Sequence, residues 1–267
     1  MTEPLNPATS PAPSPGRRLQ FRTRTLLIIV GAWALVFGLW NAYILMPYRL
    51  ERSSIALVRK QGGNVTLVDD RPAWLKKLVS DPIFEKTRAA DLDGTAVTDA
   101  DLFYLKDFDR LGGLHLRGTS ITDAGLTRIN AIKGLVQLDL SRTKITNMDL
   151  HDLPLLQDLD VSGNSFQQLR LERLPSLQSL NLRWSNIDDS HLEQLSRLPM
   201  LESIDLRGDP ASRPMKITDA GLQHLKGLTH LKTLSLYDTQ VTDEGIDELK
   251  KALPNVKVYV DPGRGPR

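Results

Sequence analysis

Carboxylates and one histidine recur in the middle of the 267-residue chain at regular spacings. Asp91, His115 and Asp139 are each 24 residues apart, so a fold that repeats every 24 residues would place them side by side. Carboxylate oxygens and an imidazole could then hold a divalent cation. Nothing in the sequence marks a supporting second layer of residues. The simpler interpretation is a solvated acidic face neutralised by Arg117 and Arg183, so we predict no metal site.

A second group of residues combines an aromatic side chain with basic ones. Trp184 follows Arg183 directly, and Arg207 lies 24 residues after Arg183. A large aromatic residue flanked by arginines is typical of the positions that dominate binding energy at protein interfaces. Trp184 could equally cover a neighbouring unit of the fold, and the sequence leaves both interpretations open.

Composition and motifs exclude most kinds of chemistry. The chain has no cysteine, which excludes disulfides, cysteine nucleophiles, thiolate metal sites and iron–sulfur clusters. It has no G-x-S-x-G, no phosphate-binding glycine loop and no H-E-x-x-H, and its other histidines are scattered. With 34 basic and 32 acidic residues, the net charge of +2 would not attract nucleic acid. We predict a protein that is not an enzyme, needs no cofactor and does not bind nucleic acid.

An internal repeat defines the elements that would position these residues. Segments with the pattern L-x-x-L-x-L recur at intervals of 21 to 30 residues, and a degenerate copy precedes them at Thr87. The phrase ITDAGL stands at 121–126 and 217–222, with looser copies at 97–102 and 241–246. The full L-x-x-L-x-L copies begin at Leu111, Leu135, Leu156, Leu177, Leu201 and Leu231.

Each repeat unit supplies a short strand, a corner and a return segment. One unit cannot bury its leucines alone, so seven units must stack into a solenoid, which the strand within 253–260 closes. In the TDAGL phrase the threonine is placed to cap a helix, and the aspartate favours the positive end of that helix. The third and fourth units are three residues shorter, so we expect at most one turn of helix in each.

Residues between the strand leucines should face outward. Neighbouring strands lie about 4.8 Å apart, so equivalent residues form rows across the sheet. The sequence predicts that these rows are polar, with an acidic region and a basic region. We predict that a protein or peptide partner binds this concave face through His115, Arg117, Asp139, Asp158, Asp160, Asn181, Arg183, Trp184, Asp205, Arg207 and Tyr237.

Residues 26–46 form an uncharged run of 21 residues. As a helix it would be about 32 Å long, which matches the hydrocarbon core of a bilayer. We expect a transmembrane signal anchor that contacts the lipid bilayer, after a disordered basic tail at 1–25. Equal numbers of basic residues flank the run, but a short basic tail is hard to translocate, so we place the N-terminus in the cytoplasm and the repeats outside. A stripe of small residues would permit a homodimer through this helix, although small residues are common in membrane helices anyway; it comprises Gly31, Ala34, Gly38 and Ala42, beside Asn41.

The remaining segments complete the predicted domain organisation. Residues 47–86 should form two helices around a strand and cap the open end of the solenoid, although a helix on the membrane surface is the rival interpretation. The repeat domain is 87–260, and 261–267 is a disordered tail. The six extra residues at 209–214 in the sixth unit should form a loop on one face.

The repeat is similar to the leucine-rich repeat. The T-D-x-G-L form resembles repeats of F-box-type substrate receptors, but the cysteine of those units is missing. The chain more closely resembles membrane-anchored leucine-rich repeat proteins of planctomycete bacteria, through LQFRTRTLLIIV at 19–30, the segment 56–84 and the T-D-A-x-L repeats. This resemblance covers nearly all of the chain after residue 19.

The resemblance implies an α/β fold: one transmembrane helix, then a right-handed curved solenoid with a parallel β-sheet on its concave face. It implies little about activity, because the functions of that family are largely unassigned. We predict a non-catalytic protein that recognises a protein or peptide on this surface. The alternative is a structural envelope protein that assembles through side-to-side contacts of its repeats.

Overall fold

The computed structural model describes residues 23–42, 46–69, 85–208 and 215–261. The chain divides into two compact units, 1–46 and 47–267, and each is described by itself. The second helix expected within 47–86, at 72–80, and the insertion at 209–214 lie outside the described residues, as do most of the two predicted tails.

The described part of the first unit is a single helix, α1 (Thr23–Trp40), which ends six residues before the predicted end of the apolar run. Its apolar side chains are exposed, with Ile28 71% and Trp33 70% exposed. Among the helices in the described ranges, none combines the length and the apolar character needed to cross a membrane.

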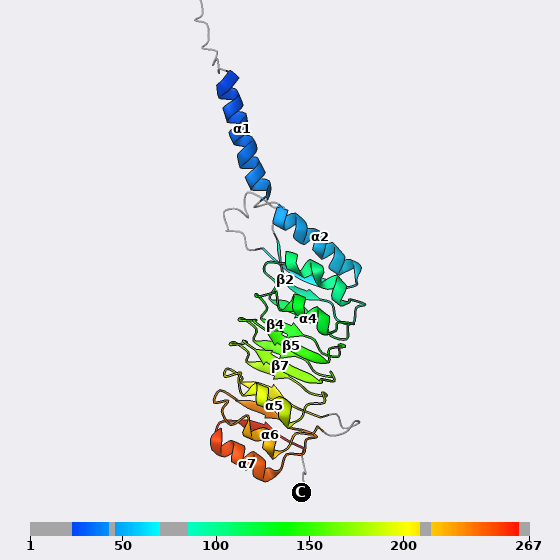
Figure 1. Ribbon diagram of the computed structural model, residues 1–267, viewed down its shortest axis with the longest axis vertical. Coiled ribbons are helices and arrows are strands. Elements are labelled where there is room, and N and C mark those ends of the chain that lie inside the picture. The colour runs from blue at the N-terminus through cyan, green and yellow to red at the C-terminus, as the bar shows by residue number, and fades with distance from the viewer. Residues whose placement is uncertain (1–22, 43–45, 70–84, 209–214, 262–267) are drawn as a thin grey trace, which may run out of the picture. The chain divides into compact units, whose positions relative to one another are not determined.

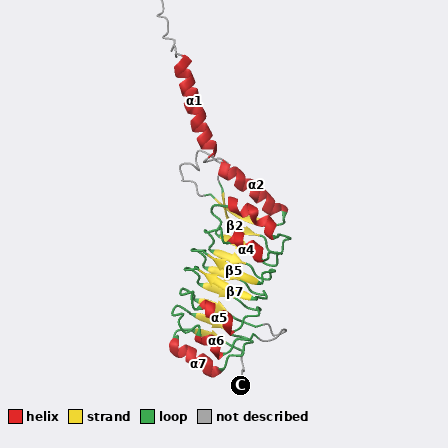
Figure 2. Cartoon of the chain, in the orientation of Figure 1, coloured by secondary structure: helices red, strands yellow, loops and turns green. Residues whose placement is uncertain are grey.

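The second unit is a solenoid whose short strands form a nine-stranded sheet (Figures 1 and 2). The strand order is β1-β2-β3-β4-β6-β8-β9-β10-β11, and all neighbours are parallel except β1 and β2. The strands are β1 (Asn64–Val68), β2 (Lys86–Asp91), β3 (Gly113–His115), β4 (Gln137–Asp139), β6 (Asp158–Asp160), β8 (Ser179–Asn181), β9 (Ser203–Asp205), β10 (Thr233–Ser235) and β11 (Lys257–Tyr259).

One apolar core runs through all the coils. The leucine pattern is buried as predicted, and so are the apolar residues at the corners that follow each strand, from Val97 to Val241. Burying one leucine side chain fully stabilises a protein by about 1.5–3 kcal/mol. Each coil shares this burial with its neighbours, so the stability of one coil depends on the coils next to it.

The longer coils return through helices, and threonine caps three of these helices as predicted. The side chains of Thr122, Thr218 and Thr242 accept hydrogen bonds from amides in the first turn of the helix that follows. The helical return segments are η3 (Asp99–Asp107), a 3₁₀ helix, and the α-helices α4 (Asp123–Ile129), α5 (Asp189–Leu195), α6 (Asp219–Gln223) and α7 (Asp243–Ala252).

The aspartate of the T-D phrase joins consecutive coils, and so does Asp189, where the phrase reads D-D; nothing in the sequence indicated this role. Asp189 accepts hydrogen bonds from the amide of Thr218 (2.8 Å) and from its hydroxyl (2.6 Å). A Cβ at Gly221 would lie 2.3 Å from Asp189 Oδ1, so only glycine fits there. The same arrangement recurs in the sets Asp99, Thr122, Gly125 and Asp219, Thr242, Gly245.

The return segments of the third and fourth units contain no turn of helix, within the predicted limit of one turn, but they are strands, which the sequence did not predict. They are β5 (Asn147–His151) and β7 (Gln168–Glu172), which pair in a separate parallel sheet. A five-residue strand spans about 16 Å, whereas seven helical residues span about 10 Å. An extended return therefore crosses the coil with fewer residues, and alternate side chains such as Leu150 and Leu171 still enter the core.

The helix α2 (Met46–Lys60) and β1 lie against the first coil. Ser54 donates a hydrogen bond to Asp107 (2.7 Å), and Lys86 forms an ion pair with the buried Glu51 (3.1 Å). Burial alone would lower the pKa of Lys86, but the carboxylates of Glu51 and Asp109 outweigh this effect and raise it. These polar contacts fix the start of the solenoid.

Candidate functional site

The outward residues of the short strands form rows across the nine-stranded sheet, and we call this surface the sheet face. Strand pairing aligns His115 with Asp139, and Asp139 with Asp160. Their row, at the strand ends, is Asp91, His115, Asp139, Asp160, Asn181, Asp205 and Ser235. The row at the strand starts is Ala89, Gly113, Gln137, Asp158, Ser179, Ser203 and Thr233. The repeat spacing therefore indicates the correct register.

An open pocket of about 320 Å³ lies on the sheet face across β3, β4, β6 and β8, and we call it the acidic pocket. Its volume is at the lower end of the range for small-ligand sites, about 300–1,000 Å³. The pocket brings together predicted site residues from four consecutive coils. Its polar lining consists of His115, Gln137, Asp139, Asp158, Asp160, Ser179 and Asn181.

The carboxylates of the acidic pocket are held by neutral donors. Asp139 Oδ1 accepts from the amide (2.8 Å) and hydroxyl (2.6 Å) of Ser141, and Asp160 Oδ2 accepts from the Asn181 side chain (2.7 Å). Within the described part of the chain, Asp139, Asp158 and Asp160 have no ion-pair partner. The expectation that Arg117 and Arg183 neutralise this face is therefore wrong, and the pocket keeps its negative charge.

The metal set weighed from the sequence, Asp91, His115 and Asp139, occupies adjacent positions in one row. In the described ranges, however, no group of three or more histidine, aspartate or glutamate residues is arranged to hold a metal ion. Burial raises the pKa of the neighbouring Asp93, and the negative charges of Asp139 and Asp91 raise it further, against the amide of Arg117. The crowded carboxylates therefore repel one another.

A second feature lies where the chain leaves β4 and β8, and we call it the arginine–tryptophan cluster: Arg142, Arg183 and Trp184. The guanidinium carbon of Arg183 lies 4.0 Å from the centre of the Trp184 ring, and that of Arg142 lies 5.4 Å from it. Trp184 is 38% exposed. Nothing in the sequence pointed to Arg142, because its reach across an intervening coil to Trp184 has no signature in the repeat.

The backbone at Trp184 is left-handed, with φ of 58°. The equivalent residues of other coils include Gly94, Gly118 and Gly163, which adopt this conformation without strain. A Cβ at Gly163 would lie 2.9 Å from Arg142 Cγ, so this glycine leaves room for the Arg142 side chain to pass toward Trp184. The cluster therefore depends on residues from three successive coils.

The remaining predicted site residues lie outside both the acidic pocket and the arginine–tryptophan cluster. Arg207 does not join Trp184 but forms an ion pair with Asp205 (2.6 Å), and this carboxylate raises the pKa of Arg207. Tyr237 is half-buried in the next coil, and Arg117 is exposed beside β3. None of these four residues lines the acidic pocket.

The Leucine Rich repeat family profile matches residues 173–195 and 227–250. Both stretches coincide with coils of the solenoid that carry the L-x-x-L-x-L strand or its return helix. The chain contains leucine-rich repeats.

Several solved structures are similar to this leucine-rich repeat chain. Internalin C2 of Listeria monocytogenes aligns with 67% of this chain and 82% of its own, at 24% identity and a TM-score of 0.49. A leucine-rich repeat protein of Leptospira interrogans aligns with 58% of this chain and 38% of its own, at 19% identity and a TM-score of 0.45. Another internalin of Listeria monocytogenes aligns with 70% and 60%, at 17% identity and a TM-score of 0.44. No curated protein matches the sequence.

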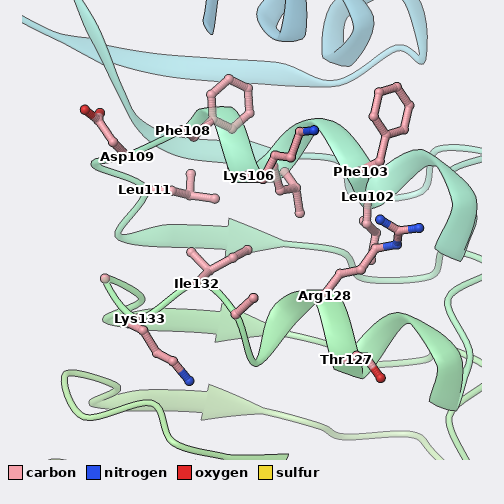
Figure 3. Close-up of a pocket in the computed structure, with 13 residues that line it drawn as sticks. Leu102, Phe103, Lys106, Phe108, Asp109, Leu111, Thr127, Arg128, Ile132 and Lys133 are labelled. Carbon is pink, nitrogen blue, oxygen red and sulfur yellow. The ribbon is translucent and has the colours of Figure 1, made fainter. Parts of the chain in front are cut away.

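A hollow of about 480 Å³ lies on the other side of the leucine-rich repeats, between η3 and α4 (Figure 3). Phe103, which is 48% exposed, Lys106 and Arg128 stand at its edges. None of the predicted site residues lines it, and no motif marked it in the sequence because its lining comes from two ordinary return segments. The apolar side chains of its floor are Leu102, Leu105, Phe108, Leu111 and Ile132.

Proposed function

We propose that the sheet face of this leucine-rich repeat solenoid binds a protein or peptide segment that carries a basic side chain. The observation on which this proposal rests is the acidic pocket, where Asp139, Asp158 and Asp160 have no ion-pair partner among the described residues. A lysine or arginine in this pocket would be attracted by three carboxylates at once.

The binding surface of the solenoid is already ordered before a partner binds. The pocket residues stand on short strands whose buried neighbours, such as Leu138 and Leu159, fix the backbone. Little side-chain or loop entropy is then lost when a partner binds. The sheet face is acidic at the pocket and basic at the arginine–tryptophan cluster. Partners that place like charges against these two regions are therefore disfavoured.

Charge-removing variants of the full-length chain test the pocket. We expect Asp158→Asn/Asp160→Asn to weaken binding of lysine-containing peptides at least about tenfold, because two close charges are worth about 1.4 kcal/mol or more when a partner is bound. The matched control, Glu193→Gln/Asp247→Asn, removes two carboxylates from exposed return-helix positions and should bind as the wild type does. Equal binding by both variants in titration calorimetry would show that the pocket is not the site.

Membrane attachment through residues 26–46 belongs to the same proposal. It is supported by the absence of charge in this run, by the exposed apolar side chains of α1 and by the resemblance to planctomycete membrane-anchored proteins. The repeat domain would then lie outside the cytoplasm. Two chains would pair through the stripe of small residues within 26–46. Alkaline extraction of membranes tests attachment, and protease treatment of spheroplasts tests sidedness; a chain released by alkali contradicts the anchor.

A further inference from the structure

The arginine–tryptophan cluster contains two cationic side chains that have no carboxylate partner within the described solenoid. In the described part of the chain, neither Arg142 nor Arg183 forms an ion pair with a carboxylate. Arg207, by contrast, is held by Asp205 through three hydrogen bonds of 2.6–3.0 Å. Arg142 and Arg183 instead lie over the Trp184 ring, and a guanidinium over a ring keeps its in-plane N–H donors available.

The donors of Arg183 are incompletely satisfied. Its Nε is buried and has no hydrogen-bond partner, and this group belongs to a side chain that is only half-buried overall. This buried Nε is out of reach of a ligand, but no hydrogen bond or ion pair within the described residues uses the terminal Nη groups of Arg183 either, so those donors remain available. A carboxylate that accepts two parallel hydrogen bonds from an arginine is the matching group.

The backbone of Trp184 supports the same interpretation. A left-handed φ of 58° strains a tryptophan, whereas glycine would fit without strain. The preceding coil carries Gly163 at the equivalent corner, where φ is 69°. At Trp184 a 38% exposed aromatic ring stands at a position that favours glycine, so the ring offers contact area to a ligand.

The cluster and the acidic pocket belong to the same coils. Asp139 and Asn181 line the pocket, and Arg142 and Trp184 follow them by three residues. Three residues span at most about 11 Å, so the two features can contact one short segment. The pocket is acidic and the cluster is basic, so a ligand that contacts both must carry a basic group and an acidic group.

We propose that the arginine–tryptophan cluster binds a carboxylate of the same peptide segment whose basic side chain enters the acidic pocket. This inference rests on the proposed function and specifies its partner: an extended segment with a lysine or arginine and an aspartate or glutamate about three residues apart. The carboxylate lies against the guanidinium groups of Arg142 and Arg183, and an apolar part of the segment packs on Trp184.

Selection of random dodecapeptides on the full-length chain tests the proposal. We expect the wild type to enrich peptides that contain both a basic and an acidic residue, with acidic residues at least about fivefold above their frequency in the library. Arg142→Gln/Arg183→Gln should lose the acidic preference and keep the basic one. Arg128→Gln/Arg197→Gln, which removes two exposed cations from return segments away from the sheet face, should keep both preferences.

A second pair of variants separates binding from folding. Trp184→Gly and Asp238→Gly each place glycine at a left-handed corner, where φ is 58° and 55°. We expect both to keep a melting temperature close to that of the wild type, and only Trp184→Gly to lose the acidic preference.

The outcomes distinguish the two proposals. Wild-type selection of basic peptides without any acidic preference would overturn the role of the cluster and leave the proposed function in place. Loss of the acidic preference in Arg128→Gln/Arg197→Gln to the same extent as in Arg142→Gln/Arg183→Gln would also overturn it. Selection of no peptide at all by the wild type would contradict the proposed function itself.

Discussion

The solenoid contains two kinds of coil, and they are joined by different devices. Helical coils, such as those of α5 and α6, are linked by an aspartate that accepts two hydrogen bonds from the next threonine, over a glycine. Extended coils, those of β5 and β7, are linked by asparagine side chains inserted between backbones. The charged device operates at partly exposed corners, whereas the amide of Asn164 is only 2% exposed.

This difference shows that each corner needs a side chain that bridges two coils, but that different residue types can form the bridge. Each corner must satisfy backbone groups that the turn leaves without partners. An aspartate can do so where water still reaches its charge, but a buried corner requires a neutral group that both donates and accepts. The comparison predicts how strongly each device contributes to stability.

The largest effect is expected at the buried amide. Asn164 accepts from the Thr143 amide (2.9 Å) and donates to the carbonyls of Leu140 (2.9 Å) and Val161 (3.0 Å). Asn164→Ala leaves these groups without partners, at about 1–3 kcal/mol each, so we expect a loss of about 3 kcal/mol in unfolding free energy. Chemical unfolding in urea measures it.

Asn186→Ala is the matched control for this prediction. Asn186 makes a similar pair of hydrogen bonds to Phe166, but it is exposed, so water can replace the amide. We expect a loss of about 1 kcal/mol. Equal losses for the two variants would contradict the distinction between buried and exposed corners.

The second effect concerns the glycine beneath the aspartate. Gly221→Ala forces a methyl group against Asp189 Oδ1, and overpacking of this kind costs about 1–3 kcal/mol. Adding Asp189→Ala removes the obstacle, so the double variant should lose less than the sum of the two single changes. His191 occupies the glycine position of α5, where the preceding coil has Gln168 in place of the aspartate. His191→Ala and Gln168→Ala should therefore show no such coupling, apart from the contact that His191 makes with Asp188 (2.6 Å) and that both His191 variants lose. Thermal unfolding of the two sets of single and double variants tests this pattern.

The third effect is a pH dependence at the boundary between the two kinds of coil. Burial alone would raise the pKa of Asp123, but hydrogen bonds from Asn147 and Thr146 outweigh burial and lower it. A lowered pKa adds stability above the unfolded value of about 3.9, and this contribution disappears as the pH falls through the folded value.

We therefore expect Asp123→Asn to lose about 1 kcal/mol at pH 6 and to approach the wild type below pH of about 3. Asp243→Asn is the control, because Asp243 stands at the same position of the last helical coil, where no further threonine follows it. A constant difference between Asp123→Asn and the wild type across this range would rule out the charged link.

The smallest effect is expected at the exposed corners of the extended coils. Arg173 and Asp152 form an ion pair there, and both have a left-handed backbone, with φ of 52° and 58°. Arg173→Gly loses a solvent-screened pair but relieves the strained backbone, so we expect an unchanged melting temperature. A clear decrease in scanning calorimetry would show that this exposed pair stabilises the extended coils.

Much of the fold follows from the sequence. The period and the leucine pattern predicted the number of coils, the buried residues and the register that brings His115, Asp139 and Asp160 into one row. These features are predictable because the apolar period is local in the sequence and identical in each unit. The three-residue shortening of two units was also visible. The extended conformation of their return segments was not predictable, since the same short sequences are compatible with a tight helical turn and with a strand.

Tertiary structure alone decided the details of the site. Only the stacking of coils shows that Asp189 lies over Gly221 and that Arg142 crosses Gly163 to reach Trp184. Contacts between residues that belong to different coils depend on side-chain direction and on which neighbour is small, and one unit does not encode them. The sequence by itself thus determined the repeating scaffold, because its period is written in every unit, whereas the charges that stay free for a partner were decided by packing between units.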